Sequence, residues 1–274
     1  MRILKSISDK ALLDLDVFNS FLARGAAFTF VRFSDGETEI LDNHFLELGK
    51  SGVIWSKGKS GYRYPDYDLK RFEPGEHSGL RSMLIESAKY TSDNYFKGIP
   101  ARHNNANSSK QKLIELNGGS ERNLTFADLF VNSNYPHFLR TTVKALQSRE
   151  NVFVVGNFRM RVELVAEDWR LVSIPDDSFS AYEEVISKTL ETLSALPSGS
   201  IVLSSASSLS NVIGWKMQAI RPDLTFIDIG TALHPQMGMG DSVREYHSQM
   251  LPWSPKNWRS KLGYHLNGSA RLKW

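Results

Sequence analysis

The chain has 274 residues, of which 41% are hydrophobic and 23% are charged, and these proportions are typical of a globular protein with one large core. It contains no cysteine, which excludes disulfides, thiolate metal ligands and a cysteine nucleophile, so any metal must be bound by Asp, Glu, His or phosphate. The net charge of +3 gives no reason to expect a nucleic-acid partner, and the lack of an apolar stretch of roughly 20 residues predicts a cytoplasmic protein without a signal peptide or membrane span.

Apolar runs that are typical of β-strands alternate along the chain with helical patterns. Alternation of this kind implies parallel pairing with right-handed crossovers. We therefore expect an α/β fold, with a Rossmann-like, mostly parallel sheet and helices on both faces, in a single domain that covers residues 1–274. The clearest expected strands lie at 27–33, 152–155, 171–174, 201–203 and 226–229.

Two helices are marked by their apolar periodicity. The first has one apolar face from 182 to 196, with Ser180 and Glu183 in the pattern of a capping box and Pro197 after its end. The second follows a Ser-rich turn and runs from 209 to 220.

Two regions depart from this alternation. Residues 56–107 are rich in Gly, Tyr, Asn, Ser and basic side chains, with a helical stretch near 80–90, and we expect a loop-rich insertion that covers the open end of the sheet. Residues 252–274 combine three tryptophans with basic side chains. Such a segment either packs its tryptophans against the domain or associates peripherally with the inner face of a membrane, where Trp and Arg are favoured.

The strongest local signal for chemistry is Arg32-Phe33-Ser34-Asp35-Gly36-Glu37, in which two carboxylates follow a buried strand. Ligands bind at the carboxyl ends of parallel strands, where loops diverge and helix N-termini point outward. Two acids so close repel each other unless a cation neutralises them, and carboxylate oxygens select Mg²⁺ or Mn²⁺. Asp35 and Glu37 are therefore candidate ligands of a metal that leaves room for a diphosphate. The alternative is a helix N-terminus, where Ser34 or Asp35 caps and Glu37 favours the dipole.

Polar residues also follow the other expected strands and would line the same crevice. Gly156-Asn157-Phe158-Arg159 offers a close backbone approach and an Arg fork for phosphate or a carboxylate, or else a turn with a solvated Arg. Ser205 and Ser207 lie in a turn that suits an anion, although such turns are often only caps. Asp228 lies inside an apolar strand, where it either bonds neighbouring loops or points into the site. His234, after the last strand, is a candidate general base, metal ligand or donor to phosphate, or a surface residue.

The candidates fall into two groups. The catalytic candidates are His234, Asp35 and Glu37, and the last two are also the metal ligands. The substrate-binding candidates are Arg32, Ser34, Gly156, Asn157, Arg159, Ser205, Ser207 and Asp228.

In their order and spacing, several motifs resemble those of the glycosyltransferase family with the GT-D fold. That family was first catalogued as a bacterial domain of unknown function and is found in glycoprotein and surface-polysaccharide glycosylation loci. The segment 31–37 is similar to the family's Arg-Phe-Gly-Asp-Gly-Glu, which contains its D-x-E metal motif. The other matching segments are 94–100, 155–158, 178–182, 202–206 and 226–230.

The resemblance implies a Rossmann-like enzyme that transfers a hexose-type sugar from a nucleotide diphosphate, with UDP as the expected nucleotide. It carries over Asp35 and Glu37 as the residues that bind Mn²⁺ or Mg²⁺ and the diphosphate. The implied acceptor is a glycan, a glycoprotein or a lipid-linked molecule. The chain departs from the family at Ser34, where relatives have Gly, and in its Ser-rich turn, where relatives often have Gly-Pro-Thr. It also lacks an acid after Gly230, so the base is open among His234, Glu163, Asp176 and Asp177.

Two other classes of protein fit the same residues. A metal-dependent phosphoesterase or nucleotide hydrolase would use the acids to activate water instead of excluding it. A non-catalytic module would bind a nucleotide or glycan without a general base.

Overall fold

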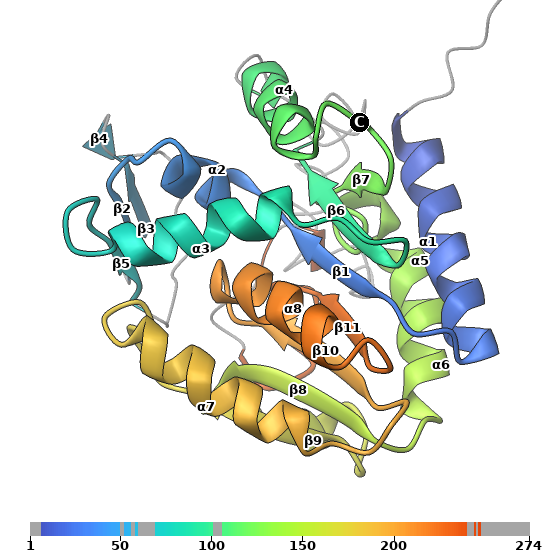
Figure 1. Cartoon of the computed structure of the whole chain (residues 1–274). Helices are drawn as coiled ribbons and strands as arrows, with labels where there is room; N and C mark the ends of the chain where they lie inside the picture. The colour runs from blue at the N-terminus through green and yellow to red at the C-terminus, as the bar shows by residue number, and fades with distance from the viewer. Residues whose placement is uncertain are drawn as a thin grey trace, which may run out of the picture.

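The computed structural model describes residues 7–49, 52–55, 58–59, 69–100, 106–239, 244 and 246–247, so the segment expected at 252–274 lies outside the described residues. Seven strands form one parallel sheet, which confirms the α/β, Rossmann-like class (Figure 1). They are β1 (Thr29–Arg32), β6 (Tyr95–Ile99), β7 (Leu124–Phe126), β8 (Val152–Asn157), β9 (Arg170–Ile174), β10 (Ile201–Ser205) and β11 (Thr225–Asp228). Their order across the sheet is β7-β6-β1-β11-β10-β8-β9.

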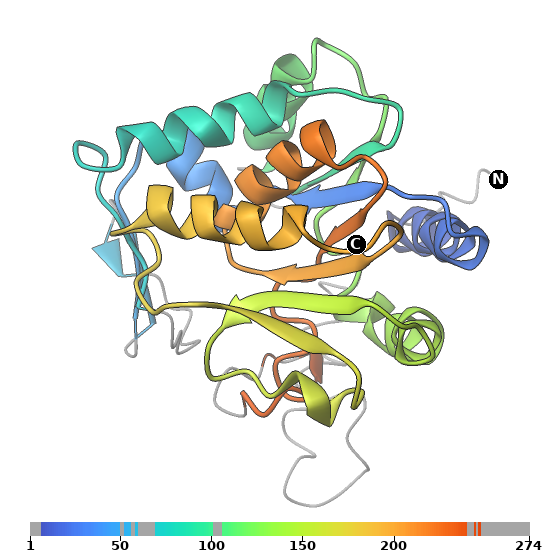
Figure 2. The same ribbon diagram turned by 60° about the horizontal axis from the view of Figure 1, so that its bottom comes forward.

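Helices cover both faces of this sheet, as Figures 1 and 2 show. Side chains alternate between the faces of a strand, so Phe30 packs in one core and its neighbour Val31 in the other. The first core contains side chains of α1 (Ile7–Arg24) and of the run α5 (Tyr135–Phe138), η2 (Leu139–Val143) and α6 (Lys144–Gln147). The second contains side chains of α2 (Asp35–Leu41), α3 (Ser78–Lys89), α4 (Ala106–Leu116), α7 (Tyr182–Ser194) and α8 (Leu209–Ile220).

The connection from β1 to β6 contains a second, antiparallel sheet. Its strands are β2 (Leu46–Gly49), β3 (Gly52–Trp55), β4 (Gly58–Lys59) and β5 (Arg71–Phe72), in the order β4-β3-β2-β5. Within the range 56–107, where we expected a loop-rich insertion, the described residues thus include α3 and β6. The strand β6 pairs with β1 in the main sheet, so this range supplies an inner strand of the sheet.

The two predicted helices are present, but the N-terminus of the first differs from the prediction. Helix α8 has the predicted bounds, Leu209–Ile220. Helix α7 begins after Ala181, and the capping box predicted for Ser180 and Glu183 is wrong. The Ser180 hydroxyl instead donates to the carbonyl of Asp177 at 2.8 Å, because Ser180 lies in the turn before the helix. No helix in the described ranges is long and apolar enough to cross a bilayer.

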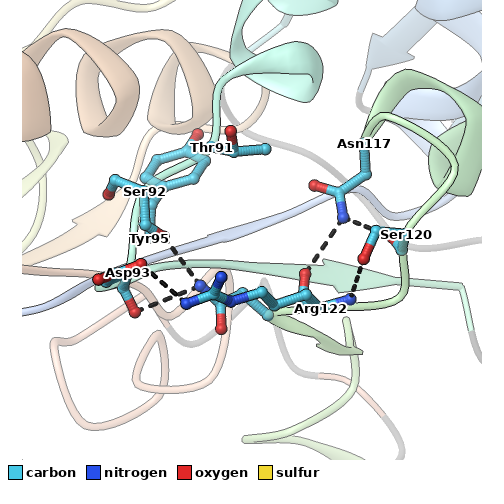
Figure 3. Close-up of a pocket in the computed structure, with 8 residues that line it drawn as sticks. Thr91, Ser92, Asp93, Tyr95, Asn117, Ser120 and Arg122 are labelled. Atoms are coloured by element: carbon cyan, nitrogen blue, oxygen red, sulfur yellow. Dashed lines mark hydrogen bonds and ion pairs between the residues drawn. The ribbon is translucent and has the colours of Figure 1, made fainter.

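A polar cavity of about 320 Å³ lies at the amino-terminal ends of β6 and β7 (Figure 3). Asn117 donates to the carbonyls of Ser120 and Arg122 in its wall, and the exposed Arg122 pairs with Asp93 at 2.9 Å. Behind this wall, buried Lys97 donates to Asn117 Oδ1 at 2.7 Å, and burial lowers the pKa of Lys97 to about 8. The cavity is at the opposite end of the strands from the site described next.

Candidate functional site

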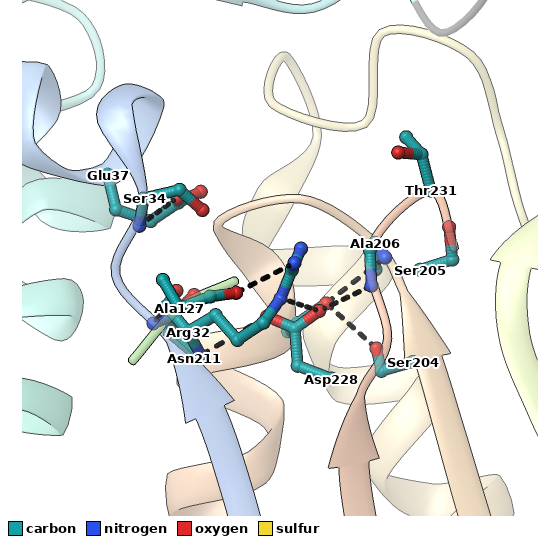
Figure 4. Close-up of polar contacts among 12 residues, drawn as sticks. Arg32, Ser34, Glu37, Ala127, Ser204, Ser205, Ala206, Asn211, Asp228 and Thr231 are labelled. Atoms are coloured by element: carbon teal, nitrogen blue, oxygen red, sulfur yellow. Dashed lines mark hydrogen bonds and ion pairs between the residues drawn. The ribbon is translucent and has the colours of Figure 1, made fainter. Parts of the chain in front are cut away.

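The carboxyl edge of the sheet has a point at which neighbouring connections diverge. Strand β8 leads outward to β9, whereas β10, which pairs with β8, leads inward to β11. Open parallel sheets bind ligands outside the carboxyl ends of strands at such a point, because the loops move apart there. The candidate site therefore lies at the carboxyl ends of β1, β11, β10 and β8 and in the loops that follow them. Figure 4 shows the part of it that β1, β10, β11 and their loops contribute.

Arg32 and Asp228 form the centre of this edge, because β1 pairs with β11. Arg32 Nε lies 3.4 Å from Asp228 Oδ1, and its backbone N–H donates to Oδ2 at 3.3 Å. Asp228 also accepts from the N–H of Gly230 at 2.9 Å. Burial raises the pKa of Asp228 to about 6, Arg32 opposes this shift, and the negative charge of Glu37 adds to it. Asp228 thus both bonds the neighbouring loop and lies among the charged groups of the site.

The two acids of the D-x-E sequence occupy different environments at the N-terminus of α2. Asp35 is exposed in the first turn, whereas Glu37 is buried. Glu37 Oε2 accepts from the N–H of Ser34, the N-cap residue, at 3.0 Å, and Oε1 accepts from the hydroxyl of Ser208 at 2.7 Å. Ser34 is thus the N-cap, as the alternative to metal binding predicted, and Glu37 takes part in the capping box instead of only favouring the dipole. Each of its oxygens accepts one of these hydrogen bonds and has capacity for a further contact.

The Ser-rich turn between β10 and α8 brings a serine and a histidine together. Ser205 Oγ lies 2.8 Å from His234 Nε2, and both side chains are buried. The structure thus places two of the predicted residues in direct contact, one at the end of β10 and one in the loop after β11. Ser207 is partly exposed and has a φ of 52°, in the left-handed region.

The candidates after β8 are engaged with the loop after β9. Arg159 forms two hydrogen bonds of 2.6 Å with Asp176, and Asn157 Nδ2 donates to the same carboxylate at 2.8 Å. The hydrogen bond from Arg159 holds the pKa of Asp176 below its usual range, against the effect of burial, and Asn157 adds to the lowering. A Cβ at Gly156 would collide with Met160, so glycine permits the close packing of this loop. The predicted Arg fork is therefore present, and of its two predicted partners, phosphate or a carboxylate, it binds a carboxylate of the chain itself.

Sequence reasoning missed several residues that hold the site together. Ser208 bonds Glu37, and buried Asn211 donates to the carbonyl of Arg32 at 2.8 Å. Ser208 directly precedes α8 and Asn211 lies in its first turn, and buried polar residues at the start of a largely apolar helix are the signal that could have found them. Tyr246 was also missed, and its hydroxyl lies 2.8 Å from that of Thr231, in the loop after β11. Burial raises the pKa of Tyr246 to about 12, so its phenol is neutral at pH 7.

The other candidate bases lie elsewhere on this edge. Glu163 is exposed in η3 (Val162–Leu164), on the connection from β8 to β9. Asp176 is paired with Arg159, and Asp177 lies next to it with a φ of 47°. Among the described residues there is no group of three or more His, Cys, Asp or Glu side chains that could hold a metal by themselves. A metal at Asp35 and Glu37 would therefore need ligand atoms from substrate or water.

No protein-family model matches the chain, and no curated protein matches its sequence. Solved structures are similar to it. One is a selenomethionine-substituted structure of domain of unknown function 1792, with a TM-score of 0.50 and 14% identity over 84% of this chain and 83% of that chain. Another is described as showing that this highly conserved domain has a distinct glycosyltransferase fold (TM-score 0.49, 15% identity, 84% and 83% covered). A third is described as a new glycosyltransferase with this domain from Streptococcus sanguinis (TM-score 0.48, 14% identity, 84% and 85% covered).

The first of these likenesses shows that the chain has the fold of domain of unknown function 1792. The resemblance that the sequence motifs indicated is thereby confirmed for the fold.

Proposed function

We propose that the chain is a metal-dependent glycosyltransferase that moves a hexose-type sugar from a nucleotide diphosphate, with UDP expected, to a hydroxyl group of a glycan, glycoprotein or lipid-linked acceptor. The observation that supports this most is the convergence of three groups at one edge of the sheet. Asp35 and Glu37 follow β1, the Arg32–Asp228 pair bridges β1 and β11, and the Ser205–His234 pair joins β10 to the loop after β11. The activity agrees with the description given to the solved structures of domain of unknown function 1792.

The acids fit a hard divalent cation. Asp35 is exposed, and the oxygens of Glu37 have capacity beyond their two hydrogen bonds. The negative charge of Glu37 reaches Asp228, whose pKa it raises, so this edge carries acidic charge that a cation would offset. Mn²⁺ or Mg²⁺ bound by Asp35 and Glu37 would stabilise the negative charge on the leaving diphosphate. Arg32 would add its own positive charge at the same edge, with Ser34 and the hydroxyl of Ser207 as further donors.

His234 is the base that the geometry favours. A base must be within hydrogen-bond reach of the proton that it accepts, directly or through one intervening group. The acceptor hydroxyl would give its proton to Ser205 Oγ while Ser205 gives its own proton to His234 Nε2, along the 2.8 Å contact between them. The acceptor oxygen then forms the bond to the sugar, and the nucleoside diphosphate leaves with the electrons of the broken bond.

The test is calorimetric titration of UDP with and without Mn²⁺. We expect Asp35→Asn to abolish the Mn²⁺-dependent part of UDP binding and to leave the fold intact, because Asp35 is an exposed residue. Glu37→Gln should have the same effect on binding, but it also removes an acceptor from Ser34 or Ser208 and should lower the melting temperature. The matched control is Glu39→Gln, which changes a carboxylate on the same helix that pairs with His44.

Two results would contradict the proposal. If Asp35→Asn binds UDP and Mn²⁺ like the parent, these acids only cap the helix. If the enzyme releases free sugar from UDP-sugars at the same rate with and without acceptors, the chain is a hydrolase that activates water. The variant His234→Ala tests whether the histidine is the base. If it is, the variant should lose turnover and retain its affinity for UDP.

A further inference from the structure

Phe158 is an exposed aromatic residue at the margin of the candidate site. It directly follows β8, and 55% of its surface is exposed. The other large hydrophobic side chains with high exposure in the described part of the chain are aliphatic: Val17, Leu69, Leu164 and Ile220. Because single exposed hydrophobic residues are ordinary on protein surfaces, the exposure of Phe158 assigns it no role by itself.

The surroundings of Phe158 hold it in place. Its N–H donates to the carbonyl of Ile174 at 3.1 Å, and the N–H of Arg159 donates to Asn157 Oδ1 at 3.1 Å. The guanidinium of Arg159 lies 4.9 Å from the centre of the Phe158 ring and is fixed by its two hydrogen bonds to Asp176. An aromatic side chain that is held in this way loses little conformational freedom when a ligand covers it.

The sheet register places Phe158 near the Ser205–His234 pair. Gly156, two residues before Phe158, is the β-sheet partner of Ser205. With strands about 4.8 Å apart and about 3.3 Å per residue, the backbone of Phe158 is roughly 8 Å from that of Ser205. Strand β1, which leads to Asp35, is three strands from β8, or roughly 14 Å. The backbone of Phe158 is therefore closer to Ser205, the partner of the proposed base, than to the strand that leads to the acids.

We propose that Phe158 is the platform on which a pyranose ring of the acceptor stacks while its hydroxyl reaches Ser205 and His234. This inference rests on the proposed function, and it selects a glycan as the part of the acceptor that the enzyme recognises. The C–H groups on one face of a pyranose are apolar and slightly positive, and they complement the apolar, negative face of an aromatic ring. Arg159 and Asp176, beside the ring, provide donors and acceptors for the sugar hydroxyls.

The experiment compares glycan binding with nucleotide binding in the full-length chain. The probes are an array of immobilised glycans and calorimetric titration with UDP and Mn²⁺. We expect Phe158→Ala to weaken binding to the glycans that the parent binds by at least about tenfold, and Phe158→Tyr to retain it, since tyrosine keeps the ring. UDP affinity should stay within twofold in both variants. The matched control is Ile220→Ala, which removes a side chain with the same exposed fraction as Phe158. Ile220 is the last residue of α8, whereas the Ser-rich turn precedes the first residue of that helix.

The outcomes separate this inference from the proposed function. Loss of glycan binding in Phe158→Ala alone, with UDP binding intact, supports the platform. If Phe158→Ala weakens UDP binding instead, the ring contacts the donor base and the inference is wrong. It is also wrong if the parent binds no glycan, or if Ile220→Ala has the same effect. A parent that fails to bind UDP with Mn²⁺ contradicts the proposed function, whatever the array shows.

Discussion

Gly230 determines where the positive charge of the site lies. Its φ of 48° is in the left-handed region, and a Cβ at this position would collide with the guanidinium of Arg32. The same guanidinium lies against Asp228 and donates to the carbonyl of Ala127 at 3.2 Å. The side chain of Arg32 therefore passes directly over a residue that has no side chain of its own.

Replacement of this glycine tests that placement. We expect Gly230→Ala to weaken UDP binding at least about tenfold and to lower the free energy of unfolding by about 2 kcal/mol, because alanine strains the backbone and displaces Arg32. Titration calorimetry and urea unfolding measure the two effects. Gly199→Ala is the control, since Gly199 has a φ of 76° but a Cβ there meets no atom within 4 Å. It should lose about 1 kcal/mol of stability and keep its UDP affinity. Equal UDP affinities in the two variants would show that Arg32 does not bind the donor.

Among the elements, a side-chain hydrogen bond links α2 to the N-cap residue of α8. The hydroxyl of Ser208, before the first turn of α8, donates to the carboxylate of Glu37 in the first turn of α2. Both groups are buried. The contact therefore holds a proposed metal ligand against the helix that follows the Ser-rich turn.

Removal of this hydroxyl should lower both the stability of the protein and its affinity for UDP in the presence of Mn²⁺. We expect Ser208→Ala to lower the free energy of unfolding by about 2 kcal/mol, since a buried carboxylate loses a hydrogen bond, and to weaken Mn²⁺-dependent UDP binding. Ser208→Thr, which restores the hydroxyl, should recover most of the affinity. Ser82→Ala serves as the control, because exposed Ser82 bonds only a carbonyl of its own helix. The coupling of the two helices would be refuted by a Ser208→Ala variant whose Mn²⁺-dependent binding equals that of the Ser82→Ala control.

The sequence predicted those elements whose signal is local. Five strands coincide with apolar runs, but β6 was missed because Lys97 and Gly98 interrupt its pattern. Lys97 is buried through acceptors on α3 and Asn117, which no local pattern shows. Capping boxes make the same point: Ser180 and Glu183 have the required spacing without the cap, whereas Ser34 and Glu37, with the same spacing, form it. Spacing permits a cap, and the surrounding turn decides whether it forms.

The candidate site shows a similar division. Its residues could be predicted because each lies at the carboxyl end of a strand or in the loop that follows, and parallel strands end at one edge of the sheet. Which of these residues contact each other could not be predicted, because their contacts depend on the order of the strands in the sheet. Arg32 meets Asp228 only because β11 lies beside β1, and the contact between Ser205 and His234 depends on the path of the chain after β11.

At the scale of the whole molecule, one sheet carries two hydrophobic cores. Phe18 attaches α1 to the first core, where its ring stacks on Phe28 at 4.9 Å and contacts Phe30 and Phe96. Since β1 contributes Phe30 to one core and Val31 to the other, damage to one core should be transmitted to the other through the strand.

This arrangement predicts cooperative unfolding. We expect Phe18→Ala to lower the free energy of unfolding by about 4 kcal/mol, as for other buried aromatic residues, while circular dichroism and tryptophan fluorescence still report one transition. Val17→Ala, at the neighbouring exposed position, should change stability by less than about 0.5 kcal/mol. Separate transitions for the two probes in Phe18→Ala would mean that the cores unfold independently.

The position of β11 has a consequence for the synthesis of the protein. This strand comes last of the seven in the chain, yet it lies between β1 and β10 in the sheet. A nascent chain on the ribosome that has not yet released residues 225–234 would have a gap in the middle of its sheet and neither Asp228 nor His234. We therefore expect donor-binding capacity to arise only after residues 225–234 have left the ribosome.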